Sequence, residues 1–150
     1  MLTIRNVDPE ELPMRLLLLA DPSEQRIRRY LIGAHAFAAS KTAGPVGVLV
    51  MRWRNGDEAE IMNVAVALEH QRTGIGRATM EFAVEYARVR GATTVSVGTG
   101  NSSLGELRFY QRLGFRITGV SRDYFGDYDP PIFEEGIRCL DMVHLSRALR

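Results

Sequence analysis

A stretch of ten residues, Glu69 to Ala78, constrains the fold of this chain more than any other part of it. It reads EHQRTGIGRA, follows the apolar run EIMNVAVA, and precedes a segment whose apolar residues recur at helical spacing. A strand that runs through a glycine loop into a helix presents free backbone N–H groups at the positive end of the helix dipole, which binds anions. Gly74 and Gly76 remove side chains where a ligand would touch the backbone, and two arginines add charge. The stretch therefore predicts a site for a pyrophosphate.

The glycine pair by itself leaves other interpretations open. A phosphate-binding P-loop needs Lys followed by Ser or Thr after its last glycine, and GIGRAT offers neither in register. A dinucleotide fingerprint needs Gly or Ala where Thr79 stands, and it usually opens a domain, whereas this loop follows several predicted strands. The remaining alternative is a glycine turn that enters an ordinary helix without binding anything.

Hydrophobic periodicity along the rest of the chain predicts an α/β fold in one domain, residues 1–150. Early strands are joined by hairpin turns and later strands by helical crossovers, which predicts a mixed, mostly antiparallel seven-stranded sheet flanked by about four helices. No repeat or linker interrupts this pattern. The expected elements are strand 2–7, helices 8–20 and 23–32, strands 34–41, 45–53 and 58–67, helix 76–90, strand 93–99, helix 103–113, and strands 115–120 and 137–146.

Composition argues against several classes of function. The chain has 19 basic and 18 acidic residues, so no overall charge attracts it to nucleic acid or to a membrane surface. No apolar stretch reaches the roughly 18 residues of a membrane span, and the first residues lack the apolar core of a signal peptide. The one cysteine, Cys139, excludes an internal disulfide and favours a reducing compartment, so we expect a cytoplasmic protein.

Neither metal chemistry nor a cysteine nucleophile is predicted. His35, His70 and His144 are scattered over different predicted elements without the spacing of metal ligands. Cys139 lies in the apolar last segment, where a small buried thiol is the ordinary interpretation.

Three segments together resemble the GCN5-related N-acetyltransferases, and in particular their small bacterial single-domain members. The segments are AEIMNVAV, QRTGIG and GTGNSSLGELRFYQRLGF, and the resemblance covers residues 58–118. The family pattern Q/R-x-x-G-x-G/A and the later Asn, Tyr and Gly-Phe positions are met by Gln71 to Gly76, Asn101, Tyr110, Gly114 and Phe115. The predicted order of elements also agrees with the family fold.

The resemblance implies how acetyl-CoA would bind as co-substrate. A strand would pair its backbone with the two amides of the pantetheine arm, as in the addition of a peptide strand to a sheet. In the family this strand bulges and diverges from the next one, here residues 93–99, which opens a notch for the thioester. Asn101 would hydrogen-bond the arm, unless it is only a turn-forming Asn. The strand residues are Asn63, Val64, Ala65 and Val66, and the pyrophosphate loop consists of Gln71, Arg72, Thr73, Gly74, Ile75, Gly76 and Arg77.

The resemblance also implies two catalytic residues. An alkyl ammonium with a pKa of about 10.4 must lose its protons before it attacks a thioester, so a base is useful. Glu60 matches the glutamate base of the histone-acetylating members. The alternative is that Glu60 is a solvent-facing carboxylate, and that Asn63 and the nearby backbone hold a water in place of a glutamate base. Tyr110 matches the tyrosine that protonates the departing thiolate; because Leu104, Leu107 and Tyr110 share helical spacing, core packing is the alternative.

We therefore expect an acetyl-CoA-dependent N-acetyltransferase whose acceptor is a primary amine of a small molecule or of a protein terminus. The segment 121–136 combines five carboxylates with aromatic residues, which suits a cationic amine. The same composition is compatible with a surface loop or with the contact of a homodimer. A non-catalytic module that binds coenzyme A or a partner protein is the competing class, and a dinucleotide oxidoreductase is a remote third.

Overall fold

The computed structural model describes residues 1–149 of the chain. The chain divides into two compact units, Met1–Thr93 and Thr94–Arg150, and each is described by itself.

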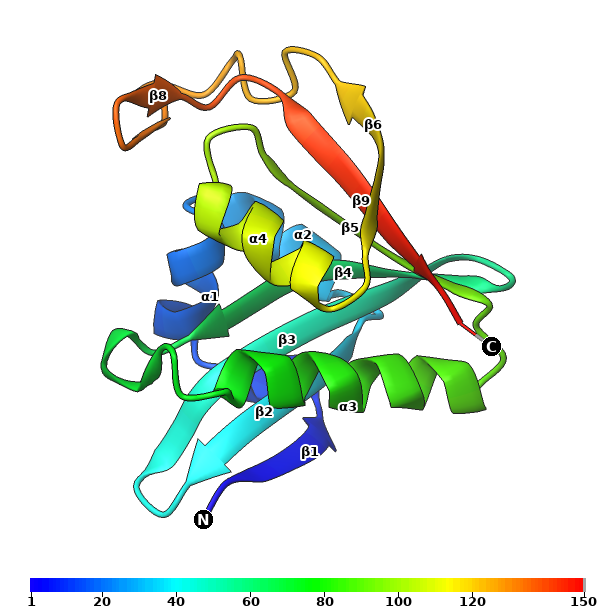
Figure 1. The fold of residues 1–150 in the computed structure, drawn as a ribbon. Helices are drawn as coiled ribbons and strands as arrows, with labels where there is room; N and C mark the ends of the chain where they lie inside the picture. The colour runs from blue at the N-terminus through cyan, green and yellow to red at the C-terminus, as the bar shows by residue number, and fades with distance from the viewer. Residues whose placement is uncertain (150) are drawn as a thin grey trace. The chain divides into compact units, whose positions relative to one another are not determined.

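The first unit is a four-stranded antiparallel sheet with helices on both faces. The strands follow the order β1-β2-β3-β4. Helices α1 and α2 cover one face, and α3 covers the other (Figure 1). The elements are β1 (Thr3–Val7), the 3-10 turn η1 (Pro9–Glu11), α1 (Met14–Ala20), α2 (Glu24–Leu31), β2 (His35–Lys41), β3 (Gly44–Asn55), β4 (Glu58–Val66), the 3-10 turn η2 (Leu68–His70) and α3 (Ile75–Val89).

The second unit contains three longer strands, one helix and a small hairpin. Strand β9 lies between β5 and β6 and is antiparallel to both, and α4 packs against β6. Strands β7 and β8 pair only with each other. The elements are β5 (Thr94–Gly100), α4 (Leu104–Arg112), β6 (Arg116–Ser121), β7 (Phe133–Glu134), β8 (Ile137–Arg138) and β9 (Met142–Ala148).

The predicted fold class is confirmed. Four strands of the first unit and three of the second make up a seven-stranded mixed sheet, and residues 1–149 contain four α-helices. Every strand pairing described within a unit is antiparallel, and the two predicted hairpins join β2 to β3 and β3 to β4.

Two predicted elements are wrong in detail. The helix expected over residues 8–20 is a 3-10 turn followed by the separate helix α1, because Pro13 lacks an N–H and stands at the N-cap of that helix instead of in a helix interior. The strand expected over residues 137–146 is split into β8 and β9. The segment predicted as a loop before it contains β7 and the turn that joins β7 to β8, where Glu135 and Gly136 have φ of 51° and 80°.

The core between the sheet and helices α1 and α2 fixes β4 in place. Its buried residues come from both helices, from three strands and from the ends of the neighbouring loops, so β4 cannot slip in register without exposing them. They are Leu12, Leu16, Leu17, Ile27, Tyr30, Ala36, Ala38, Val48, Val50, Ala65 and Ala67.

Candidate active site

The glycine loop leaves the first turn of α3 without a side-chain cap. Gly74 is the N-cap residue and has a left-handed backbone, φ 87°, which glycine adopts at no steric cost. The first backbone hydrogen bond of the helix runs from the N–H of Ala78 to the carbonyl oxygen of Gly74, at 3.0 Å. The N–H groups of Ile75, Gly76 and Arg77 come before it and have no intrahelical partner. The start of α3 can therefore donate several hydrogen bonds to an anion.

Two anchors hold the glycine loop in this position. The Gln71 side chain donates from Nε2 to the Val66 carbonyl oxygen at 3.0 Å, which ties the loop to the last residue of β4. Ile75 is buried against Ala39 and Val46 at the start of the helix. The structure thus brings together the predicted strand residues and the predicted loop residues.

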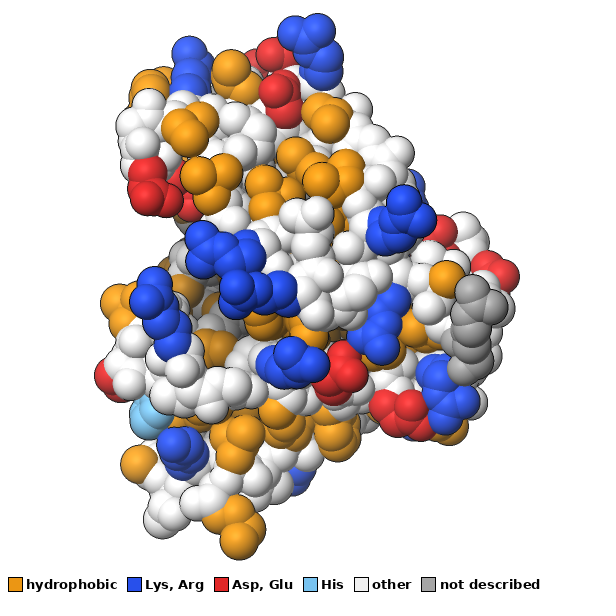
Figure 2. Space-filling model, in the orientation of Figure 1, with side chains coloured by type: hydrophobic (Ala, Val, Ile, Leu, Met, Phe, Trp, Pro, Cys, Tyr) orange, Lys and Arg blue, Asp and Glu red, His pale blue; other side chains and the backbone are white. Residues whose placement is uncertain are grey.

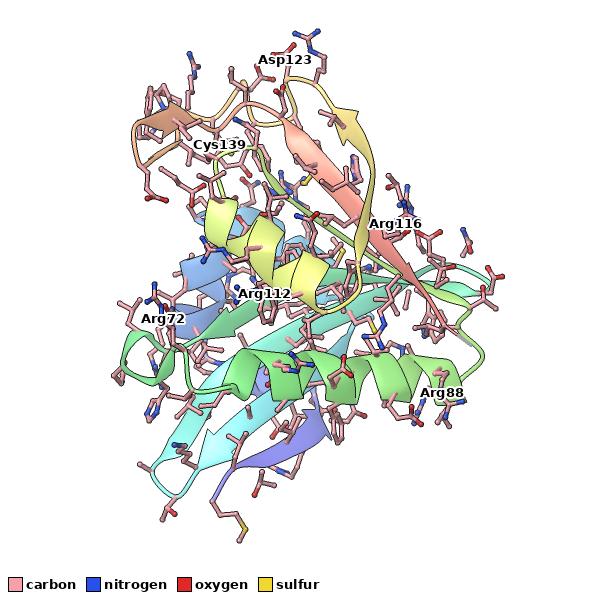
Figure 3. The ribbon with its side chains drawn as sticks, viewed as in Figure 1. Arg72, Arg88, Arg112, Arg116, Asp123 and Cys139 are labelled. Carbon is pink, nitrogen blue, oxygen red and sulfur yellow. The ribbon has the colours of Figure 1, made fainter. Side chains whose placement is uncertain are left out.

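Positive charge is available at the loop. Arg72 and Arg77 are exposed, and Arg72 has a left-handed backbone with φ 63°. Figure 3 shows Arg72 in the loop before α3 and Arg88 at the other end of that helix, where Arg88 pairs with Glu85 at 2.6 Å. Basic side chains are exposed on the face that carries the loop and α3, and acidic ones lie among them along the helix (Figure 2).

The bulge expected in the strand before the loop lies at Met62. Val50 is opposite Asn63 and Met51 is opposite Ile61, so Met62 has no partner on β3. This extra residue changes the alternation of side chains along β4.

The bulge places Glu60 and Asn63 on one face of β4 although they are three residues apart. Asn63 lies opposite Val50, which packs into the core beneath α1 and α2. Glu60 lies opposite Arg52, whose guanidinium donates to the carbonyl oxygens of Tyr30 and Ile32 at the end of α2. Opposite residues of paired strands share a face, so Glu60 and Asn63 both face the helices α1 and α2.

The side chain of Asn63 is buried, with 4% of its surface exposed. Its Nδ2 donates to Leu17 O and to the Tyr30 hydroxyl oxygen, both at 3.0 Å. The Tyr30 hydroxyl donates in turn to Asp21 Oδ2 at 3.2 Å, and burial raises the pKa of Tyr30. This network uses only the side chain of Asn63. It therefore leaves the predicted pairing of the Asn63 backbone with the coenzyme unaffected.

Tyr110 is buried in the second unit, with 5% of its surface exposed. It lies on α4 between the rings of Phe109 and Phe115, with centroids 5.4 and 6.0 Å away. Burial raises the pKa of Tyr110, and the charge of Glu106 one turn earlier raises it further. The hydroxyl therefore keeps its proton at neutral pH and can act as an acid. Leu104, which shares the helical spacing of Tyr110, is 45% exposed and is no part of a common core stripe.

Asn101 has a structural role that its sequence pattern did not indicate. Its Oδ1 accepts from the N–H groups of Leu140 at 2.8 Å and Asp141 at 2.9 Å, and its Nδ2 donates to Arg138 O at 3.1 Å. These bonds hold the segment between β8 and β9 and leave one amide hydrogen for other partners. A contact of Asn101 with the pantetheine arm stays a prediction.

Sequence reasoning missed the anchor of the β7–β8 hairpin. Glu134 Oε1 accepts from the hydroxyls of Ser102 at 2.7 Å and Ser103 at 2.8 Å, next to the start of α4. Partial burial of the Glu106 carboxyl raises its pKa, and the charge of Glu134 adds to the shift. The pair of serines before a helix was the available signal, since hydroxyls there commonly bind nearby polar groups.

Cys139 and the histidines are engaged in ordinary contacts. Cys139 is buried, as expected, but it lies between β8 and β9, and burial raises the pKa of its thiol. His35 Nδ1 lies 2.8 Å from the Tyr86 hydroxyl, and His144 Nε2 lies 2.7 Å from Ser121 Oγ.

Among residues 1–149, no three His, Cys, Asp or Glu side chains group as they would around a metal ion. None of the helices described has the length and apolar character to span a membrane.

Comparison with known proteins identifies the class to which this fold and loop belong. The sequence model of the acetyltransferase (GNAT) family matches residues 6–115, so the chain belongs to that family and is an N-acetyltransferase. Both the predicted family and the predicted enzyme class are confirmed.

Three relatives extend this result over nearly the whole chain. An uncharacterized N-acetyltransferase of Bacillus subtilis, YvbK, is 42% identical over 131 residues, which are 87% of this chain and 84% of the relative. The structure of an IAA acetyltransferase from Bacillus cereus has a TM-score of 0.95 at 41% identity and covers 99% of this chain and 100% of its own. The structure of a GNAT family acetyltransferase from Elizabethkingia anophelis with acetyl-CoA bound has a TM-score of 0.93 at 37% identity. It covers 99% of this chain and 98% of its own.

Proposed function

We propose that the protein transfers the acetyl group of acetyl-CoA to a primary amine of a small molecule or of a protein terminus. The observation that carries this proposal is the uncapped first turn of α3, held at the end of β4 by the Gln71 side chain. The diphosphate of coenzyme A lies on the N–H groups of Gly74 to Arg77, where Arg72 and Arg77 add charge. The backbone of Asn63 to Val66 pairs with the amides of the pantetheine arm.

Proton transfers accompany the attack of the amine. Glu60 removes a proton from the acceptor ammonium, and the free amine nitrogen then attacks the thioester carbonyl carbon. The carbon–sulfur bond breaks as the tetrahedral intermediate collapses, and the sulfur leaves as a thiolate. Tyr110 donates its hydroxyl proton to that thiolate, and the nitrogen gives up its remaining extra proton to the Tyr110 oxygen, so that a neutral amide, a free thiol and a protonated Tyr110 result. The Tyr110 hydroxyl is protonated at neutral pH, so it has a proton to give when the sulfur leaves.

The acceptor carries a positive charge next to an apolar group. The segment 121–136 supplies carboxylates, and Glu134 among them is fixed by Ser102 and Ser103. Phe133 is 62% exposed on the same hairpin and offers apolar surface. A fixed carboxylate and an exposed ring on one hairpin suit a cationic amine with an apolar neighbour.

Residues 1–150 act as one catalytic domain in this proposal, because the family match at residues 6–115 runs through both compact units. We also propose a cytoplasmic location, which the unpaired Cys139 supports. A homodimer is compatible with the exposed side chains of Ile117 and Val120 on the edge strand β6, and light scattering would detect it.

A screen of amines tests the proposed function. Acetyl-CoA and the enzyme would be mixed with an alanyl peptide, spermidine or 2-phenylethylamine, and release of free thiol would be recorded. We expect release above background with at least one amine and none with 2-phenylethanol, which has the same apolar group without the nitrogen. Background release with every amine, despite tight binding of coenzyme A, would instead support a non-catalytic module.

Glu60→Gln is expected to lower kcat/KM for the best amine of this screen about 100-fold at neutral pH. The loss should shrink as the pH approaches the pKa of the amine, because more of the acceptor is then already deprotonated. Glu58→Gln is the matched control: Glu58 lies two residues earlier on β4 and pairs with Arg54 at 3.4 Å. A pH-independent loss in Glu60→Gln, or an equal loss in the control, would contradict the role of Glu60 as the base.

A further inference from the structure

Asn63 carries an unsatisfied hydrogen-bond acceptor in the interior of the first unit. Among residues 1–149, its Oδ1 is the one fully buried side-chain nitrogen or oxygen without a hydrogen-bond partner. Buried polar atoms are nearly always paired in folded proteins, so this atom calls for an explanation.

The orientation of the Asn63 amide is fixed by its other contacts. The carbonyl oxygen of Leu17 can only accept, so the group that faces it at 3.0 Å must be Nδ2. The Asp21 carboxylate takes the hydroxyl hydrogen of Tyr30, which leaves the Tyr30 oxygen free to accept the second hydrogen of Nδ2. Both amide hydrogens are thus used, and a flip of the amide would place two acceptors against each other. Oδ1 is therefore a hydrogen-bond acceptor without a donor in the part of the chain that the structure describes.

The neighbour of this acceptor along β4 is Glu60. The bulge at Met62 puts both side chains on the face of α1 and α2, and their partners on β3, Val50 and Arg52, are two residues apart. Without the bulge, residues three apart would point to opposite faces of the sheet. The strand therefore turns an amide oxygen and a carboxylate to the same face, where Met62 also packs against the core.

A donor for this pair must reach it on the side of the sheet that α1 and α2 cover, not along the edge of the sheet. Backbone pairing with a pantetheine arm uses N–H and C=O groups that lie in the plane of the sheet, whereas the Asn63 and Glu60 side chains stand out of that plane. A primary ammonium has three N–H donors and can bond to both oxygens at once.

We propose that Asn63 Oδ1 accepts a hydrogen bond from the nitrogen of the acceptor amine and, together with Glu60, orients that nitrogen. This inference rests on the proposed function. Asn63 Oδ1 takes one N–H while Glu60 takes the proton that is removed, so the lone pair that forms has a defined direction. Asn63 is then a residue that selects a nitrogen acceptor, and its loss weakens binding of the amine more than binding of coenzyme A.

The test compares Asn63→Leu with Tyr30→Phe. Asn63→Leu keeps the shape of the side chain and removes Oδ1, and we expect KM for the best amine of the screen to rise about ten-fold with Kd for coenzyme A within about two-fold. Tyr30→Phe breaks the same buried network but keeps Oδ1 and the bond to Leu17, so its KM should stay within about two-fold of the wild type. An unchanged KM in Asn63→Leu, or an equal rise of KM and of the coenzyme Kd, would overturn the inference.

A measurement on the wild-type protein covers the case in which Asn63→Leu does not fold. The same amine would be titrated into enzyme saturated with coenzyme A, and the Cγ resonance of Asn63 followed by NMR. We expect this resonance to shift, while those of Asn6 and Asn101, whose side chains bond to backbone groups, stay in place. An ordered water on Oδ1 would leave the Asn63 resonance unmoved and would refute the inference. Failure of the proposed function is distinct, since the wild type would then release no thiol with any amine.

Discussion

Tyr110→Phe is expected to turn over about 100-fold more slowly than the wild type while it binds coenzyme A with nearly unchanged affinity. The substitution removes one oxygen and keeps the ring that packs against Phe109 and Phe115. Without the hydroxyl, the departing thiolate must take its proton from water, which raises the barrier of that step alone. Steady-state kinetics with the best amine, together with calorimetry of coenzyme A binding, separates the two effects.

Tyr86→Phe is a suitable control for this variant. Tyr86 lies on α3 in the first unit, and its hydroxyl is 2.8 Å from His35 Nδ1. Its loss removes a partly buried hydrogen bond but no group in the proposed chemistry. If Tyr110→Phe retained wild-type kcat, the proton would have to reach the sulfur by another route, and Tyr110 would be a packing residue only.

Gly74→Ala is expected to weaken binding of coenzyme A at least about ten-fold. Nothing lies within 4 Å of the methyl group that this change adds, so the free protein has room for it. The backbone φ of 87° costs an alanine about 1 kcal/mol, which lowers the free energy of unfolding. In the proposed complex the diphosphate lies against this glycine, so an added methyl would obstruct it and lower the affinity.

Gly91→Ala is the matched control, because Gly91 follows the other end of the same helix. Its φ is 98°, and nothing lies within 4 Å of an added methyl there either. Chemical denaturation should therefore show a similar loss of stability in both variants, with calorimetry showing weaker coenzyme binding in Gly74→Ala only. Equal affinities in the two variants would mean that the diphosphate does not lie on the glycine loop.

The loop and the strand before it could be predicted because their determinants are local. Gly74 and Gly76 lie between an apolar strand and an amphipathic helix, and the backbone consequences of that order depend on neighbours in the chain. Pro13 is also a local signal, because its missing N–H places the start of the helix after it. The bulge at Met62 was anticipated from the family resemblance, since the alternation of AEIMNVAV does not reveal it.

The roles of Asn63 and Asn101 could not be predicted, because their partners are distant in sequence. Asn63 bonds to Leu17, 46 residues earlier, and Asn101 bonds to Leu140, 39 residues later. A single sequence without its tertiary contacts shows only that an asparagine is present, and asparagine is common in turns. The unsatisfied Oδ1 of Asn63 is visible only once both of its amide hydrogens have been accounted for.

The clamp of Asn101 on residues 138–141 has an evolutionary consequence. The Asn101 side chain, together with the backbone bonds of Asn101 and Phe125 to Asp141 and Leu140, fixes the residue at which β9 begins. Insertions and deletions in the segment between β6 and β9 can therefore accumulate without shifting the pairing of β9 with β5. Such a chain can diversify in the molecules it acetylates while the scaffold beneath stays constant.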